Sequence, residues 1–299
     1  MSNTIAASEA ALAHRIELTA NDMRHDMIRM LEAAGSGHPG GSLSAADILA
    51  TLFFSGEMGY DPSDPDNHDA DRFFLSKGHA APALYAVFHQ LGWIADEELA
   101  TLRHLGSRLQ GHPDCHAMSG LEVCSGSLGQ GLSISAGVAL GLSIDDREAA
   151  EKRRVYCLLG DGEMQEGSNW EAMMFASHHR LDNLVAILDL NNLQIDGHVT
   201  DVCSLGDIDA KFASFGWNVR RVGGHDVSAL IEALRWAKGE LGSGRPSVII
   251  CETIKGKGVS FMEDACGWHG VAPDAEQAAA AIAELDAARA ALEKEDING

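Results

Sequence analysis

Basic residues are scarce in this sequence. It contains 22 Lys and Arg against 44 Asp and Glu, which gives a formal net charge of −22 over 299 residues. Nucleic acids and anionic membrane surfaces are bound by clusters of Lys and Arg. We therefore expect neither a nucleic acid nor a membrane as a partner.

Long apolar runs, a secretory leader and paired cysteine motifs are also missing. No segment reaches the roughly 20 apolar residues of a membrane helix. Residues 1–10 lack the charged and apolar regions of a signal peptide, so we expect a cytoplasmic protein. The six cysteines include no CxxC spacing, and Cys157 and Cys251 fall in predicted buried strands. We expect reduced thiols rather than a disulfide framework or a zinc site.

The hydrophobic content and the length set the size of the core. Hydrophobic residues make up 45% of the chain, which supports a substantial core. The length suits one large α/β domain and would also permit two smaller ones. We see no internal repeat and no interdomain linker, so we predict a single domain over residues 1–299. Its last element is an alanine-rich helix at about residues 274–295.

The most informative stretch runs from Val155 to Gly197. An apolar run at 155–159 stops at Gly160-Asp161-Gly162, a helical pattern follows, and a second apolar run at 184–188 ends in Asp189-Leu190-Asn191-Asn192. Strand, turn, helix and strand form a βαβ unit, and both strands look buried on both faces, which is typical of a parallel sheet. Open α/β sheets bind ligands at the carboxyl ends of such strands.

The residues at these two strand ends suit a metal and a phosphate. Gly160 and Gly162 let the backbone approach a phosphate closely. Asp161, the Asn191 amide and the Leu193 carbonyl offer three hard oxygens, and Mg²⁺ takes such ligands together with phosphate oxygens and water. The alternative is two ordinary turns, because Gly, Asp and Asn favour turns. The recurrence of the pattern at two neighbouring strand ends favours the metal site.

The rest of the chain predicts alternating helices and strands. Ser44 and Asp47 form a plausible capping box for a helix that ends at Phe54. Asp96 is expected to cap a helix that runs through Leu105. The stretch 106–131 has no clear period, and a long irregular stretch inside a compact domain usually carries function. The other predicted helices cover residues 9–34, 132–144 and 226–241, and the other predicted strands cover residues 72–75, 218–222 and 247–254.

Four of the fourteen histidines lie in glycine-bearing loops: His38, His79, His112 and His269. Neutral imidazoles accept and donate protons near neutral pH, which suits a polyhydroxy substrate. The other histidines mostly fall in helical patterns, where solvent or core packing is the better explanation. His112 and His116 are four residues apart, but Pro113 prevents the helix that would align them on a metal, so we do not predict zinc there.

These motifs together resemble a known family. Gly160-Asp161-Gly162 with Asn191 is similar to the thiamine-diphosphate motif, and the segments SGHPG, KGH, GHPD and WHG are similar to loops of transketolase. The resemblance covers roughly Arg15 to Pro273 and corresponds to the amino-terminal half of an ordinary transketolase. It implies the thiamine-diphosphate-binding fold, an α/β fold with a parallel sheet and helices on both faces. It also implies thiamine diphosphate and Mg²⁺ as cofactors, or Ca²⁺ or Mn²⁺ in place of Mg²⁺.

The resemblance assigns roles to individual residues. His79 would touch the cofactor diphosphate, His38 and His112 would face the substrate, and His269 would lie between the two. The implied catalytic residues are therefore His38, His112 and His269. The implied metal ligands are Asp161, Asn191 and Leu193. The implied cofactor-binding residues are His79, Gly126, Ser127, Leu128, Gly160, Asp161, Gly162, Glu163, Asn191 and His269.

Two positions depart from the pattern of full-length transketolases. Lys77 stands where many of them have Asn, and Ser127 stands where they commonly have Pro. Both residues resemble the two-subunit members of the family. They leave the preference for a particular sugar open.

The expected function is transfer of a two-carbon ketol unit from a ketose phosphate to an aldose. In this family a glutamate on a separate pyrimidine-binding domain activates the cofactor, and we find no second strand–helix set for that domain. The chain thus resembles the N-terminal subunit of a split transketolase, active with a C-terminal partner as a dimer of such pairs. Alternatives are a subunit like 1-deoxyxylulose-5-phosphate synthase or 2-oxo-acid dehydrogenase, and a non-catalytic paralogue that binds the cofactor for regulation. A branched or sulfonated sugar is an alternative to the sugar phosphates of central metabolism.

Overall fold

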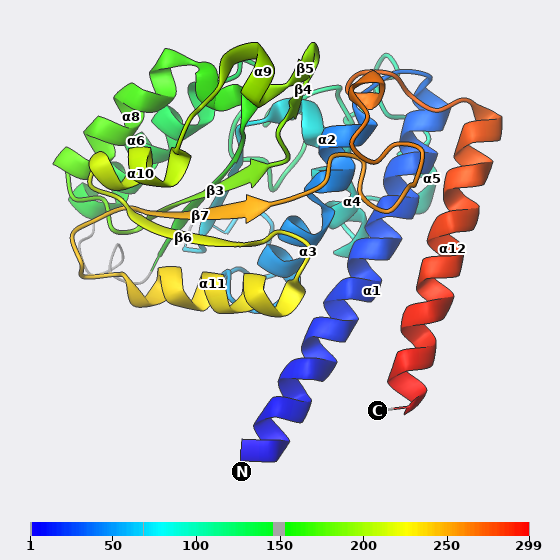
Figure 1. Cartoon of the computed structure of the whole chain (residues 1–299), viewed down its shortest axis with the longest axis horizontal. Coiled ribbons are helices and arrows are strands. Elements are labelled where there is room, and N and C mark those ends of the chain that lie inside the picture. Colours follow the sequence, from blue (N-terminus) through cyan, green and yellow to red (C-terminus); the bar gives the residue numbers. More distant parts are fainter. Residues whose placement is uncertain (1, 68, 146–152, 299) are drawn as a thin grey trace.

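The centre of the molecule is a five-stranded sheet in which every neighbouring pair is parallel. The computed structural model describes residues 2–67, 69–145 and 153–298 (Figure 1). The strand order is β1-β2-β3-β7-β6. The strands are β1 (Arg72–Leu75), β2 (Val155–Gly160), β3 (Leu184–Leu190), β6 (Asn218–Gly223) and β7 (Ser247–Glu252), and a separate small hairpin joins β4 (Leu193–Gln194) to β5 (Gly197–His198).

Helices cover the sheet and its carboxyl edge. Asp207 and Asp226 cap two of them, because each carboxylate accepts the N–H of the residue three positions on. The helices are α1 (Ser2–Ala34), α2 (Pro39–Ser44), α3 (Ala46–Phe54), α4 (Ala81–Gln90), α5 (Asp96–Leu99), α6 (Gln130–Asp145), α8 (Gly167–His178), α9 (Val199–Cys203), α10 (Ile208–Ser214), α11 (Val227–Gly239) and α12 (Ala275–Asn298), with short 3₁₀ turns at Gly78–Ala80, Gly162–Gln165 and Cys266–Trp268.

Alternate residues of each central strand point to opposite faces of the sheet. In β2, Tyr156 and Leu158 belong to a core shared with α1, α3, α4, α11 and α12. Val155, Cys157 and Leu159 belong to a second core, shared with α6, α8 and α10. The central strands are therefore buried on both sides, which confirms the predicted α/β fold with helices on both faces.

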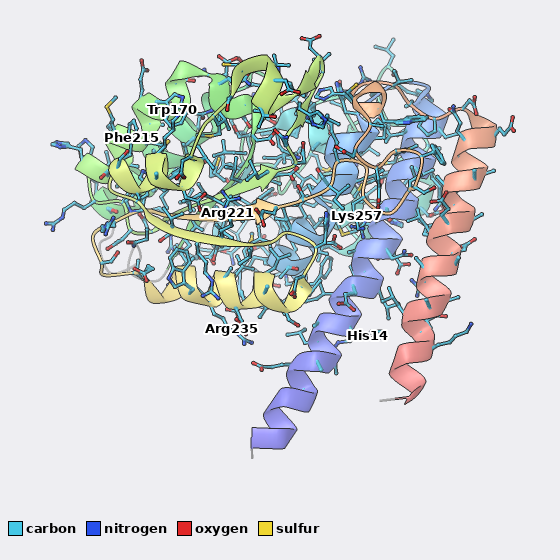
Figure 2. The ribbon with its side chains drawn as sticks, viewed as in Figure 1. His14, Trp170, Phe215, Arg221, Arg235 and Lys257 are labelled. Atoms are coloured by element: carbon cyan, nitrogen blue, oxygen red, sulfur yellow. The ribbon has the colours of Figure 1, made fainter. Side chains whose placement is uncertain are left out.

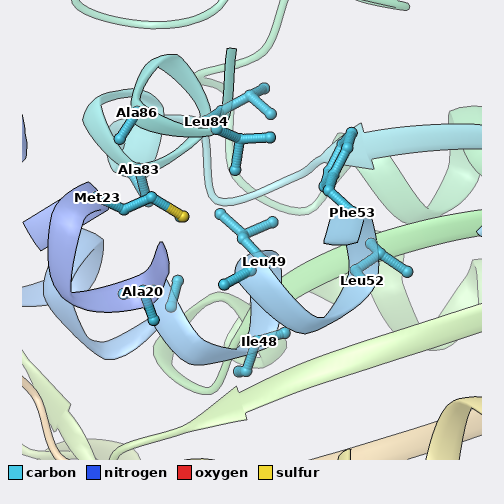
Figure 3. Close-up of a cluster of buried hydrophobic side chains, with 14 of the residues drawn as sticks. Ala20, Met23, Ile48, Leu49, Leu52, Phe53, Ala83, Leu84 and Ala86 are labelled. Carbon is cyan, nitrogen blue, oxygen red and sulfur yellow. The ribbon is translucent and has the colours of Figure 1, made fainter. Parts of the chain in front are cut away.

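The first core is the larger and is closed mainly by α1, α3 and α4. Figure 3 shows the side chains of Met23, Leu49 and Leu84 meeting between these helices. All three are at most 3% exposed. On the outer side, α12 runs next to α1 and contributes Ala281 and Leu285 to the same core (Figure 1). This packing explains the weak apolar pattern of α12, which needs only one narrow apolar stripe.

The second core lies under shorter helices. Trp170 of α8 and Phe215, just after α10, pack with ring centroids 5.8 Å apart and are labelled in Figure 2. The buried Trp217 donates its indole N–H to the carbonyl of Met173 at 3.1 Å. Several large apolar side chains on α6 and α8 stay exposed, among them Ile134 at 36% and Met174 at 55%.

Two local predictions were wrong. Ser44 and Asp47 do not form a capping box, because Ser44 Oγ donates to Asp189 Oδ2 at 2.6 Å and the Asp47 carboxylate pairs with Arg24. The helix at Asp96 ends at Leu99 rather than at Leu105. Arg103 there adopts a positive φ of 62° and donates its N–H to the carbonyl of Leu109, which turns the chain away from a helical path.

Within the described residues, no helix is both long enough and apolar enough to span a membrane.

Candidate active site

The carboxyl ends of β2, β3 and β7 meet at one edge of the sheet. The register pairs Gly160 of β2 with Asp189 of β3, and Leu190 with Glu252 of β7, so the three ends lie level. In Figure 1 the arrows of β3 and β7 point towards α2 and the β4–β5 hairpin. A cavity of about 230 Å³ opens here, which we call the inner cavity. It is lined by Gly41, Lys77, His79, Leu128, Gly160, Asp161, Gly162, Glu163, Gln165, Glu166, Asn191, Leu193, Gln194, Ile195, Asp196, Lys255 and His269.

Asp161 directly follows the last residue of β2, and it is buried, only 3% exposed. It accepts the backbone N–H of Gly162 at 2.7 Å and that of Asn192. Burial, followed by the charge of Asp189, raises the pKa of Asp161 to about 6. Ionised Asp161 is therefore poorly compensated in this chain, and a bound cation would stabilise it.

Asn191 and Leu193 bring two more oxygens to the same cavity. Asn192 between them has φ of 56°, a left-handed turn that Asn tolerates better than most residues. The Asn191 side-chain oxygen accepts the N–H of Leu193 at 3.1 Å. One carboxylate and two neutral oxygens at one cavity are the hard ligands that Mg²⁺ prefers, so the residues fit such an ion.

Lys255 is a functional candidate that the sequence analysis missed. It follows the end of β7, is 3% exposed, and donates from Nζ to the Leu193 carbonyl at 2.7 Å. Nζ also lies 2.6 Å from His269 Nδ1. Burial, followed by the charge of Lys77, lowers the pKa of Lys255 to about 8. Its position beyond a strand end was the available signal, because ligand-binding residues gather there.

The Lys255 ammonium makes no ion pair with any residue in the described parts of the chain. A buried cation without a counter-charge is costly unless a bound anion neutralises it. Gly160, at the end of β2, and Gly162, at the start of a 3₁₀ turn, line the same cavity. Together these groups provide the cationic side chain and the close backbone approach that a phosphate group requires.

Lys77, by contrast, is neutralised within the chain. Its Nζ pairs with the fully buried Asp189 and donates to the Gly41 carbonyl at 2.8 Å. Ser44 and Thr253 also donate to Asp189. Burial alone would raise the pKa of Asp189, but Lys77 and these hydrogen bonds hold it below its ordinary value. This pair ties α2, β1 and β3 together under the inner cavity.

Glu163 lines the inner cavity, and its carboxylate already accepts hydrogen bonds from three other residues of the chain. It accepts from the Ser76 hydroxyl, from the N–H of Gly129 at 2.9 Å and from the N–H of Gly160 at 3.1 Å. These bonds join three loops that border the cavity. Burial raises the pKa of Glu163 in spite of them. The geometry gives Glu163 a positioning role next to the cofactor-binding role that the sequence implied.

Three imidazoles cluster around His38. Its ring centroid lies 5.3 Å from His79, 5.6 Å from His269 and 6.4 Å from His112. His79 and His269 stack at 5.3 Å. The four loops, far apart in sequence, therefore bring their histidines together in one cluster. The backbone fits this cluster closely, since a Cβ at Gly41 would lie 3.2 Å from His79 Nε2.

The imidazoles are held neutral. Burial, followed by the charge of neighbouring Lys255, lowers the pKa of His269 to about 3. Burial, followed by His112, lowers the pKa of His38 to about 4, and burial with Lys77 lowers that of His79 well below its usual range. His38 Nδ1 is buried and has no hydrogen-bond partner among the described residues. A neutral nitrogen left without a partner in this way is suited to a ligand hydroxyl.

His112 lies on the open side of this cluster. It lines a wide cavity of about 620 Å³, the outer cavity, together with Arg103, Gln110, Gly111, Pro113, Asp114, His116, Cys124 and Ser125. Partial burial, followed by the Arg103 charge, lowers the pKa of His112. Arg103 is a second residue that the sequence analysis missed, because we expected it inside a helix.

The three residues of the segment Gly126-Ser127-Leu128 lie in different surroundings. Gly126, with φ of 134°, packs on His112 so tightly that a Cβ there would lie 3.0 Å from the ring. Leu128 lines the inner cavity and is 36% exposed. Ser127 is exposed and is not among the residues that line either cavity. Of this predicted trio, only Leu128 faces the inner cavity.

Comparison with known proteins identifies the family of this chain. Residues 16–290 match the family described as "Transketolase, thiamine diphosphate binding domain". Over 252 residues the chain is 46% identical to human transketolase, which covers 84% of this chain and 39% of that protein. It is 40% identical over 267 residues to the 6-deoxy-6-sulfo-D-fructose transketolase subunit of Clostridium sp. (strain MSTE9), covering 89% of this chain and 94% of that subunit.

The fold comparison gives the same family. The structure of transketolase from Pichia stipitis in complex with sedoheptulose-7-phosphate superposes with a TM-score of 0.79 and 29% identity, over 96% of this chain and 45% of that one. The chain therefore spans about two fifths of the length of human transketolase and nearly the full length of the Clostridium subunit.

Proposed function

The chain belongs to the transketolase family, and from this premise we propose that it is the N-terminal subunit of a heteromeric transketolase. It would transfer a two-carbon ketol unit from a ketose or ketose phosphate to an aldose, with thiamine diphosphate and Mg²⁺ as cofactors. The observation that carries the proposal is the inner cavity. It combines three hard oxygens, an ammonium that forms no ion pair with the described residues, and neutral imidazoles, at the carboxyl edge of a parallel sheet.

The residues of the inner cavity would hold the cofactor by its diphosphate. Asp161, Asn191 and the Leu193 carbonyl would bind the metal ion, and Ca²⁺ or Mn²⁺ could take its place. The Lys255 ammonium contacts the Leu193 carbonyl and His269 Nδ1 in this structure. On cofactor binding it would reorient to pair with the diphosphate. Gly160 and Gly162 would admit the phosphates to the backbone. The bound cofactor would supply a nucleophilic thiazolium carbon that adds to the ketose carbonyl.

The imidazoles would handle the sugar. His269 lines the inner cavity, His112 lines the outer one, and the His38 ring centroid lies 5.6 Å from that of His269 and 6.4 Å from that of His112. Their low pKa values keep them neutral at physiological pH, so each can donate one hydrogen bond and accept another. This set can orient sugar hydroxyls and move a proton at a hydroxyl oxygen. We propose His38, His112 and His269 as the catalytic residues of this chain.

A second subunit would complete the site. In support of this, the Clostridium relative, of similar length, is named as a subunit. Apolar side chains are exposed on α6 and α8, where we expect the partner to dock: Ile134 at 36%, Ile144 at 72%, Met174 at 55% and Phe175 at 39%. We propose that the partner carries the pyrimidine-binding domain with its activating glutamate. Two such pairs would form a dimer of heterodimers.

The substrate class has two candidates. Sugar phosphates are favoured by the Pichia stipitis relative, whose structure is a complex with sedoheptulose-7-phosphate. A sulfonated sugar is favoured by the Clostridium relative, whose name is 6-deoxy-6-sulfo-D-fructose transketolase subunit. Both kinds of sugar carry an anionic group. Arg103 lines the outer cavity, where its guanidinium could bind such a group.

The test is ketol transfer by the chain alone and with its C-terminal partner. The chain should be freed of host transketolase and assayed with thiamine diphosphate and Mg²⁺ on ketose phosphate and 6-sulfo ketose donors. We expect no turnover and weak cofactor binding by the chain alone, because an open site orders the cofactor without matching contacts. The partner should restore turnover. Thiamine diphosphate at a hundred times its Kd should also stabilise the assembled complex against unfolding by about 2.7 kcal/mol.

Robust turnover by the single chain would show that the site is complete without a partner. The subunit hypothesis would then be wrong, while the cofactor assignment would stand. No turnover from the assembled pair on any ketose donor, with cofactor bound, would instead contradict the ketol-transfer function.

A further inference from the structure

Four potential metal ligands meet in the loop that follows His112. One ligand atom from each of Asp114, Cys115, His116 and Cys124 lies within 4.8 Å of the others. Asp114 and Cys115 are half-buried, and His116 and Cys124 are exposed. Three of the four line the outer cavity, and none has a role in the function proposed above.

The two thiols form the centre of this cluster. Cys115 Sγ and Cys124 Sγ are 3.4 Å apart, and the Cys124 thiol donates to Asp114 Oδ1 at 3.1 Å. The sequence does not reveal this pairing, because the cysteines are nine residues apart and follow no common zinc spacing. In the sequence, His116 lies four residues from His112, and Pro113 between them excludes a helical metal pair. The fold pairs it with the cysteines instead.

The backbone holds these ligands in place. The N–H of Ser125 donates to the carbonyl of Pro113 at 3.0 Å, which closes the loop just outside the cluster. The N–H of His116 donates to the Asp114 carboxylate at 2.9 Å, and the N–H of Ala117 donates to the Asp114 carbonyl at 3.0 Å. The ligands therefore sit on a closed turn, so a metal would need mainly side-chain rotations.

We propose that Asp114, Cys115, His116 and Cys124 form a Zn²⁺ site. Two thiolates, one imidazole and one carboxylate are ligand types that Zn²⁺ takes in a four-coordinate tetrahedron. With Zn–S bonds of about 2.3 Å, two tetrahedral sulfur ligands lie roughly 3.8 Å apart, close to the observed thiol separation. Soft thiolates also discriminate against Mg²⁺, which prefers the oxygen ligands of the inner cavity.

The other cysteines do not offer such a site. Cys157 and Cys251 are fully buried in β2 and β7, where burial raises their thiol pKa far above the usual value. Cys203 and Cys266 are exposed, and neither belongs to a metal-ligand cluster among the described residues. They therefore serve as matched controls.

Zinc here would fix the wall of the outer cavity. The ligands Asp114 and Cys124 directly flank Pro113 and Ser125, and His112 and Gly126 follow on either side. A bound ion would connect residues 114–116 to Cys124 and so hold the His112 ring against Gly126. The binding itself does not depend on the function proposed above, because neither the cofactor nor a partner contributes a ligand.

Cobalt substitution tests the proposal directly. Co²⁺ bound to a thiolate gives a charge-transfer absorption in the near ultraviolet that histidine or oxygen ligands do not give. The full chain, kept reduced and saturated with Mg²⁺, should take up about one equivalent of Co²⁺ with this absorption, and Zn²⁺ should displace it. The control Cys203→Ser/Cys266→Ser should behave in the same way. Cys115→Ser/Cys124→Ser should lose the absorption, and His116→Ala should weaken Zn²⁺ binding by about tenfold or more.

Circular dichroism and thermal melting establish that each variant is folded before titration. The proposal is overturned if the reduced wild-type chain gives no thiolate absorption. It is equally overturned if Cys115→Ser/Cys124→Ser, correctly folded, keeps it. Recovery of Cys115 and Cys124 as a disulfide that persists under the reducing conditions would assign the pair to redox chemistry instead and would also refute the zinc site.

Discussion

The inner and outer cavities differ in what surrounds their polar groups. Around the inner cavity, Lys77, Asp189 and Glu163 are buried, and each is satisfied by partners from several segments of this chain. Around the outer cavity, His112, His116 and Cys124 are exposed on a loop. Buried groups from several segments of the fold thus support the inner cavity, whereas the outer cavity is lined in part by side chains exposed to solvent.

This difference separates two kinds of residue within one proposed active site. Groups under the inner cavity hold the ends of the strands together, so their loss should affect folding as well as binding. The exposed His112 side chain on the outer cavity buries little surface, so its loss should affect mainly the chemistry. The variants below test this separation, from the largest expected effect to the smallest.

Asp161→Ala should abolish Mg²⁺-dependent binding of thiamine diphosphate. The variant removes the carboxylate proposed as a metal ligand, and no other carboxylate among the proposed ligands replaces it. Calorimetry with the partner subunit present measures the effect. Asp196→Ala, at the exposed rim of the same cavity, is the matched control and should bind almost normally. Binding by Asp161→Ala as tight as that of the wild type would disprove the ligand assignment.

His38→Ala and His112→Ala should keep the cofactor but lose ketol transfer. Removing a group that positions or protonates the sugar typically costs about 10²–10⁴ in rate. Steady-state kinetics with a ketose phosphate donor and an aldose acceptor measures kcat/KM, and calorimetry checks that the cofactor still binds. If both variants keep the wild-type kcat/KM, these histidines do not handle the sugar.

Asp189→Ala should destabilise the chain by about 3–5 kcal/mol, because it leaves the buried Lys77 ammonium without its counter-charge. His112→Ala should change the free energy of unfolding by no more than about 0.5 kcal/mol, since its side chain is exposed. Urea unfolding compares the two. Lys77→Met/Asp189→Leu, which removes both charges, should recover part of the loss. Equal urea midpoints for Asp189→Ala and His112→Ala would show that residues of the two cavities do not differ in their contribution to stability.

The neutral histidines predict a pH dependence of stability. The pKa of His38 is lowered from its ordinary value of 6.5 to about 4 in the folded chain. As the pH falls from about 6.5 to 4, the unfolded chain therefore gains a proton that folded His38 does not, and stability is lost. His38→Asn should lose roughly 1–3 kcal/mol less over this window than the wild type. Urea unfolding of the cofactor-free chain at several pH values measures it, with Ser36→Ala as the control. Parallel curves for His38→Asn and wild type would mean that His38 takes up its proton at an ordinary pH.

Most of the fold could be predicted from the sequence because it rests on local patterns. The apolar runs at 155–159 and 184–188 are long enough to identify strands buried on both faces, and both are strands in the structure. The glycine and asparagine at their ends mark turns for the same local reason. The helix from Asp96 was predicted too long, because its end depends on Arg103 bonding to Leu109 across a turn.

The four loop histidines could be found from the sequence, but their shared location could not be derived from spacing alone. Strand order decides it, because the pairing of β2 with β3 and β3 with β7 brings four distant loops to one edge. Ser44 shows the converse: its local pattern suggested a cap, yet the approach of Asp189 offers it a charged acceptor instead. In a cap the Ser44 oxygen would accept a backbone N–H. Ser44 instead ends α2, and its hydroxyl donates to the buried Asp189 carboxylate, a charged acceptor that makes a strong hydrogen bond.

The sequence by itself thus determined the strands, the glycine turns and the identity of the oxygen, imidazole and thiol groups, because each depends on residues close together in the chain. Only the tertiary structure decided which of these groups meet. It placed Lys255 at the inner cavity with no ion pair among the described residues, used the Glu163 carboxylate to join three loops, and brought Cys115 within reach of Cys124. Such contacts depend on how strands order and loops close, and side-chain chemistry alone leaves that choice open.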